Sequence, residues 1–131
     1  MDKIKLAIAD DHAVFRQTFR FLLEQEPDFS VIAEVGDGLA AVELVEQHHP
    51  DVLLIDVRLP RLDGIKATGI ITKKHPATKV ICLTLFTEME RERLPWKPEH
   101  VFACPKRAAS PECLRPSEVA TTRQSRMLFK R

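Results

Sequence analysis

The 131-residue sequence has no tyrosine, a single tryptophan, only four glycines and no long apolar run. A membrane span needs roughly 20 consecutive apolar residues, and Lys3 and Lys5 interrupt the short apolar stretch at the amino terminus, so we expect neither a span nor a signal peptide. The three cysteines are an odd number without Cys-x-x-Cys spacing, which disfavours a disulfide framework and a zinc site. We therefore expect a cytoplasmic protein with no membrane partner.

The sequence also lacks an excess of charge of either sign. Its 20 basic and 19 acidic residues give a formal net charge of +1, so nothing in the overall balance indicates binding to nucleic acid or to a membrane surface. Residues 107–131 are locally basic, but with Phe129 as their only aromatic residue they are more typical of a solvated end than of a nucleic-acid interface. We expect no DNA binding by this chain alone.

Apolar runs of strand length alternate with stretches of helical periodicity, which is the pattern of βα units around a parallel sheet. The length suits one domain. One predicted helix has Phe15, Phe19, Leu22 and Leu23 on a single face and ends near Glu26, because Pro27 follows. A second has Ala41, Leu44, Val45 and His48 on one face and ends at Pro50. Further predicted elements are strands at 3–9, 30–35, 52–55, 79–83 and 101–104 and a helix at 65–74.

After residue 84 the local signals no longer agree with one another. Pro95 and Pro98 would end a fourth helix after about two turns, and Pro116 would end a helix that starts at Ser110 after about one turn. We therefore predict an α/β fold with a doubly wound, five-stranded parallel sheet and a degenerate fourth and fifth helix region. Residues 1–115 are the predicted domain; residues 116–131 are a tail or linker remnant, either disordered or exchanged between chains.

Three carboxylates follow apolar runs in the same manner: Asp10 and Asp11 after the first strand, and Asp56 after the third. Parallel strands place such residues at one edge of the sheet, and clustered carboxylates ionise readily only with a cation among them. Oxygen ligands with room for water suit Mg²⁺. The alternative is that these acids cap the helices that follow. His48 and His49 diverge on a helix and indicate a helix end rather than a metal site.

Two segments carry a likeness to a known family: ADDHAVFR at residues 9–16 and PDVLLIDVRLPRLDG at residues 50–64. Thr84 and Lys106 follow them in the expected order. With these motifs the chain resembles the response-regulator receiver domain of two-component systems, most closely the subfamily usually joined to a helix-turn-helix DNA-binding domain. The likeness is strong over residues 3–86 and weak over 87–115, and it implies a flavodoxin-like fold.

The resemblance also implies a function and a set of site residues. Asp56 would accept a phosphoryl group from a sensor histidine kinase, and the domain would assist its own phosphorylation and dephosphorylation without being an enzyme on a released substrate. Phosphorylation would switch a protein interaction or the missing DNA-binding output. Mg²⁺ would be held by Asp10, Asp11, Asp56 and the backbone carbonyl of Arg58, with Lys106 and Thr84 contacting the phosphoryl oxygens. His12 would be a loop or first-turn residue.

The chain departs from the family pattern in its last third. Ala103 stands where an aromatic residue is usual, and Phe102 would point to the opposite face of a strand. Leu85 replaces a small residue and would narrow access to Asp56. We expect altered signal readout, together with a homodimer or exchange of carboxyl-terminal elements.

Two alternatives remain open. One is a pseudo-receiver that acts as a phosphorylation-independent interaction adaptor. The other is a small Mg²⁺-dependent phosphohydrolase with Asp56 as nucleophile, which would need a second acid nearby where the sequence has Arg58.

Overall fold

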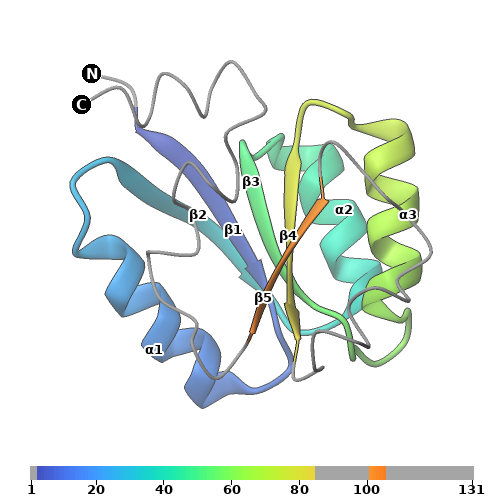
Figure 1. Cartoon of the computed structure of the whole chain (residues 1–131), viewed down its shortest axis with the longest axis horizontal. Coiled ribbons are helices and arrows are strands. Elements are labelled where there is room, and N and C mark those ends of the chain that lie inside the picture. Colours follow the sequence, from blue (N-terminus) through green and yellow to red (C-terminus); the bar gives the residue numbers. More distant parts are fainter. Residues whose placement is uncertain (1–2, 85–100, 106–131) are drawn as a thin grey trace.

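A parallel β-sheet forms the centre of the protein, with helices on both of its faces (Figure 1). The structure is a computed structural model and describes residues 3–84 and 101–105. Within those ranges the chain forms five strands and three helices: β1 (Ile4–Ala9), α1 (Ala13–Glu24), β2 (Phe29–Val35), α2 (Gly38–His48), β3 (Val52–Asp56), α3 (Gly64–Lys74), β4 (Lys79–Thr84) and β5 (Val101–Pro105). These elements confirm the predicted alternation of strands and helices.

The strand order is β2-β1-β3-β4-β5, and every neighbouring pair is parallel. The chain leaves β1 toward one edge of the sheet to form β2, and then crosses back to β3 on the other side of β1. The strand order therefore reverses between β1 and β3, and open α/β sheets place their sites at such a point, beyond the carboxyl ends of the strands. The doubly wound sheet predicted from the sequence is confirmed. The predicted fourth and fifth helices and the tail lie outside the described residues.

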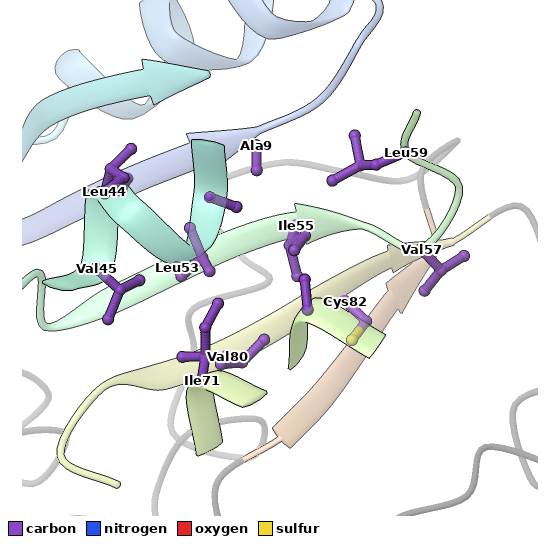
Figure 2. Packing of buried hydrophobic residues seen from close by; sticks show 13 residues of the cluster. Ala9, Leu44, Val45, Leu53, Ile55, Val57, Leu59, Ile71, Val80 and Cys82 are labelled. Carbon is purple, nitrogen blue, oxygen red and sulfur yellow. The ribbon is translucent and has the colours of Figure 1, made fainter. Parts of the chain in front are cut away.

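The two faces of the sheet are covered by different helices. Helix α1 buries Phe19 and Leu23 on one face, against Leu6, Ile8 and Leu54 of the central strands. Helices α2 and α3 cover the opposite face, where their apolar side chains meet Leu53, Ile55, Val80 and Cys82 (Figure 2). All five residues of β3 are buried, as predicted for a strand covered on both sides.

The helix ends follow local signals in the sequence. Asp37 caps α2 by accepting a hydrogen bond from the backbone N–H of Ala40 at 2.8 Å, and Asp63 caps α3 by accepting one from Ile65 at 2.7 Å. At the other end of α2, His49 adopts a left-handed conformation with φ of 47° directly before Pro50. The prediction that His48 and His49 mark a helix end is confirmed.

Two residues that were predicted to share the apolar face of their helix are exposed. Leu22 is 38% exposed, because the buried stripe of α1 runs through Phe19 and Leu23 and Leu22 lies at its margin. His48 is exposed as the last residue of α2, one turn beyond the buried Leu44 and Val45. In both helices the spacing of apolar residues predicted the side that faces the sheet. It did not predict how wide the buried stripe is or at which residue it stops.

No helix among the described residues is long and apolar enough to cross a membrane.

Candidate metal centre

The three predicted carboxylates meet at the carboxyl edge of the sheet, at the point where the strand order reverses. Asp10 directly follows β1, Asp56 is the last residue of β3, and these two strands are neighbours in which Ala9 pairs with Ile55. One ligand atom from each of Asp10, Asp11, His12 and Asp56 lies within 4.8 Å of all the others. The structure therefore confirms that the carboxylates converge, and it adds His12 to the group.

The carboxylates differ in their access to solvent. The side chain of Asp10 is completely buried and that of Asp56 is 8% exposed, whereas that of Asp11 is 39% exposed. Burying carboxylates this close together is costly unless positive charge or hydrogen bonds compensate. Asp10 thus forms the floor of the cluster, and Asp11 forms its solvent side.

The backbone turns in the same way after both strands. Oδ1 of Asp10 accepts a hydrogen bond from the backbone N–H of His12 at 2.8 Å, and Oδ1 of Asp56 accepts one from that of Arg58 at 3.0 Å. A carboxylate that bonds the N–H two residues ahead closes an Asx turn. Each strand therefore ends in a turn that fixes one oxygen of its own carboxylate.

The alternative that these acids cap the following helices is wrong. The residue at the N-cap position of α1 is His12, which makes no side-chain capping bond, and α3 is capped by Asp63. Neither α1 nor α3 takes its cap from Asp10, Asp11 or Asp56, so their shared position at the sheet edge needs another explanation.

The imidazole of His12 lies over the cluster. Its Nδ1 atom is 3.3 Å from Oδ1 of Asp10, 3.2 Å from Oδ1 of Asp11 and 4.0 Å from Oδ2 of Asp56. The sequence interpretation gave the backbone position of His12 correctly but missed where its side chain lies. The sequence feature that could have indicated this contact is the position of His12 directly after Asp10 and Asp11.

Arg16 is a second residue that the sequence interpretation missed. Its Nη1 donates to the backbone carbonyl of Asp10 at 2.5 Å, and its Nε donates to Oε1 of Glu34 in β2 at 3.0 Å. Arg20 binds the other oxygen of Glu34 at 2.7 Å, and this hydrogen bond is the main reason why the pKa of Glu34 is lowered. Helix α1 is thereby joined to β2, and the backbone of Asp10 is held to both.

The other predicted site residues are described only in part. Arg58 is exposed and contributes its N–H to Asp56, while a role for its carbonyl as a ligand stays a prediction. Thr84 ends β4 next to β3, where Asp56 pairs with Leu83, but its side chain lies outside what is described. Lys106 and Leu85 are outside the described residues altogether.

The donor set suits a small, hard divalent cation. Carboxylate oxygens are the ligands that Mg²⁺ prefers, and it usually keeps several waters beside one or two of them. Here one carboxylate is buried, one is partly open to solvent, and a third lies on the neighbouring strand. Within residues 3–84, this is the one group of three or more potential ligand side chains close enough to share an ion.

Comparisons with known proteins agree on one family. The family model described as "Response regulator receiver domain" matches residues 6–94. The transcriptional regulatory protein DegU of Brevibacillus brevis is 42% identical over 84 residues, which cover 64% of this chain and 36% of that protein. A protein-glutamate methylesterase/protein-glutamine glutaminase of Shewanella oneidensis is 43% identical over 82 residues, which cover 63% of this chain and 23% of that protein.

A solved structure extends the likeness to most of the chain. The DNA-binding response regulator of the LuxR family from Staphylococcus aureus superposes with a TM-score of 0.74 at 27% identity, covering 93% of this chain and 98% of the other. This chain spans well under half the length of the two curated relatives that it matches.

Proposed function

This chain belongs to the response-regulator receiver family of two-component systems, and from that premise we propose that it accepts a phosphoryl group on Asp56 from a sensor histidine kinase. The observation that carries the proposal is the convergence of Asp10, Asp11 and Asp56 within 4.8 Å at the point where the strand order reverses. Three acids that cap no neighbouring helix and share one edge of the sheet suit a cation-assisted reaction better than a structural role.

Asp56 is the proposed nucleophile. Its Oδ1 accepts the N–H of Arg58, which fixes the carboxylate plane, and its Oδ2 lies on the side of His12 and the other acids. In the transfer, a carboxylate oxygen of Asp56 forms the new bond to phosphorus while the bond from phosphorus to the kinase histidine nitrogen breaks, and that nitrogen keeps the electron pair. The side chain is only 8% exposed, so the donor must reach a carboxylate that is almost buried.

The neighbouring acids and Arg58 would hold Mg²⁺. Asp10 is buried and tied to the backbone of His12, so it offers a fixed position, while Asp11 faces solvent and leaves room for water ligands. When bound, Mg²⁺ supplies positive charge to the phosphoryl oxygens as their negative charge spreads during transfer. We propose Arg58 as a further ligand through its carbonyl, and Lys106 and Thr84 as contacts to the phosphoryl oxygens.

The proposed role is signalling rather than turnover of a released substrate. Phosphorylation would change a protein interaction or the activity of an attached output domain, and hydrolysis assisted by the same site would reset it. A phosphohydrolase would need a second acid on the nucleophile's loop to act as general acid, and the exposed Arg58 stands two residues after Asp56, where such an acid would be useful. A phosphorylation-independent adaptor would not require three carboxylates to lie this close together. We further propose the cytoplasm as the location.

Intact mass spectrometry after incubation with Mg²⁺ and acetyl phosphate tests the proposal. We expect one phosphoryl adduct on the chain without substitutions and none on the Asp56→Asn variant. The matched control is Asp37→Asn, which alters an acid that caps α2 outside the cluster and should still form the adduct. An adduct that persists in Asp56→Asn, or a folded unmodified chain that forms none, would contradict the proposal.

A further inference from the structure

His12 differs from the other members of the cluster because it offers nitrogen instead of oxygen. Its Nδ1 lies 3.2 Å from Oδ1 of Asp11 and 3.3 Å from Oδ1 of Asp10, while Oδ2 of Asp56 is 4.0 Å away. The ring is 66% exposed and is therefore not held there by burial in the core. The contacts of Nδ1 with the carboxylates, including one within hydrogen-bond distance of Oδ1 of Asp10, hold the ring beside the three acids.

These separations resemble those between ligands that share one ion. Ligand atoms about 2.1 Å from an octahedral ion lie about 3 Å apart when adjacent and about 4 Å apart when opposite. All three distances fall within the span between two ligands of one such ion, so the four side chains could share it. The backbone helps to keep this arrangement, because the N–H of His12 is bound by Oδ1 of Asp10.

We propose that His12 is a nitrogen ligand of the metal held by Asp10, Asp11 and Asp56, and that it makes this site favour Mn²⁺ over Mg²⁺. The inference rests on the metal site of the proposed function. Imidazole nitrogen is a ligand of first-row transition ions, and Mn²⁺ is the one among them that also suits carboxylate and water ligands, whereas Mg²⁺ prefers oxygen and gives up its water reluctantly. Replacing a water ligand by Nδ1 therefore strengthens the binding of Mn²⁺ and does little for Mg²⁺.

His12 can be replaced without removing a cap of α1 or the backbone hydrogen bond to Asp10. The side chain makes no capping bond to α1, and the bond from His12 to Asp10 uses the backbone, which His12→Ala retains. His48 is a suitable control because it is an exposed histidine at the end of α2, remote in the chain from the acids. Thermal unfolding of each variant without metal checks that the fold is kept.

The first test is calorimetric titration of the full chain with Mn²⁺ and, separately, with Mg²⁺ at one slightly alkaline pH. We expect His12→Ala to weaken Mn²⁺ binding about tenfold or more and to leave Mg²⁺ binding nearly unchanged. His48→Ala should alter neither. Equal effects of His12→Ala on both ions, or no effect on Mn²⁺, would overturn the inference.

The second test needs no variant. Electron spin echo spectra of the Mn²⁺-loaded chain should show coupling to a directly bound imidazole nitrogen, and growth with ¹⁵N-histidine should convert those lines to ¹⁵N lines. If Mg²⁺ and Mn²⁺ bind but no histidine coupling appears, the role of His12 is wrong and the proposed acidic metal site stands. If neither ion binds, both the inference and the metal-dependent part of the proposed function fail.

Discussion

At the scale of single residues, Gly64 links the metal centre to the packing of α3. A Cβ atom at this position would overlap the backbone carbonyl of Asp56, and the N–H of Gly64 donates to the carbonyl of Val57 at 3.1 Å. The first residue of α3 therefore lies against the end of β3, and a larger residue here must displace the strand that carries Asp56.

Gly64→Ala is expected to lower the free energy of unfolding by about 1–3 kcal/mol, as overpacking usually does, and to weaken Mg²⁺ binding by shifting Asp56. The matched control is Gly69→Ala, in the same helix but with no atom within 4 Å of the added carbon. That change should stabilise the protein by up to about 1 kcal/mol, since alanine is the better helix former. Urea unfolding of both variants measures the difference, and equal stabilities would refute the overlap.

Cys82 provides a second residue-scale prediction. It is completely buried in the cluster between the sheet and α3, and burial raises the pKa of its thiol to about 12 (Figure 2). The thiolate is the reactive form, so Cys82 should resist iodoacetamide in the folded protein at neutral pH and react after denaturation. Peptide mass mapping distinguishes it from Cys104 and Cys113. Rapid native labelling of Cys82 would contradict this burial.

At the scale of elements, α1 is joined to β2 by Glu34. Arg20 and Arg16 both bind its carboxylate, and the bond from Arg20 is the first cause of the lowered pKa of Glu34. Because the folded-state pKa is lower than the unfolded one, the stabilisation is complete above the unfolded pKa of about 4.3 and disappears as the pH falls through the folded value.

Glu34→Gln should therefore reduce the free energy of unfolding by about 1 kcal/mol at neutral pH, and the difference from the unmodified chain should shrink toward zero in acid. Denaturant unfolding at a series of pH values measures this. Glu24→Gln is the control, since Glu24 pairs with Arg20 in the same helix on a more exposed surface. A deficit in Glu34→Gln that does not depend on pH would show that the carboxylate charge is not the cause.

The sequence predicted the elements that depend on local signals. The apolar run 52–55 predicted a strand, and Pro27 and Pro50 predicted where α1 and α2 end. The exposure of Leu22 depends on how α1 is placed on the sheet, which periodicity does not specify. The convergence of the three carboxylates was predictable because both parallel strands are followed by acids at the same edge of the sheet. The orientation of the His12 ring was not predictable, since it depends on a turn that forms only in the folded protein.

At the scale of the whole molecule, we propose that residues 1–115 form the complete receiver domain. Every residue proposed for the site, including Lys106, precedes residue 116. A chain that ends at Arg115 should therefore unfold cooperatively, bind Mg²⁺ as tightly as the full chain and form the same phosphoryl adduct. Calorimetry and intact mass spectrometry test this. Loss of cooperative unfolding would show that residues 116–131 are part of the domain.

The central claim is that Asp56 becomes an acyl phosphate, and borohydride reduction tests it most directly. Hydride from borohydride reduces an aspartyl phosphate to homoserine with release of phosphate, whereas an unmodified carboxylate is not reduced. After treatment with Mg²⁺ and acetyl phosphate, peptide sequencing by mass spectrometry should find homoserine at position 56, and none when the phosphodonor is omitted. Homoserine at Asp10, Asp11 or another aspartate, with residue 56 unchanged, would contradict the account.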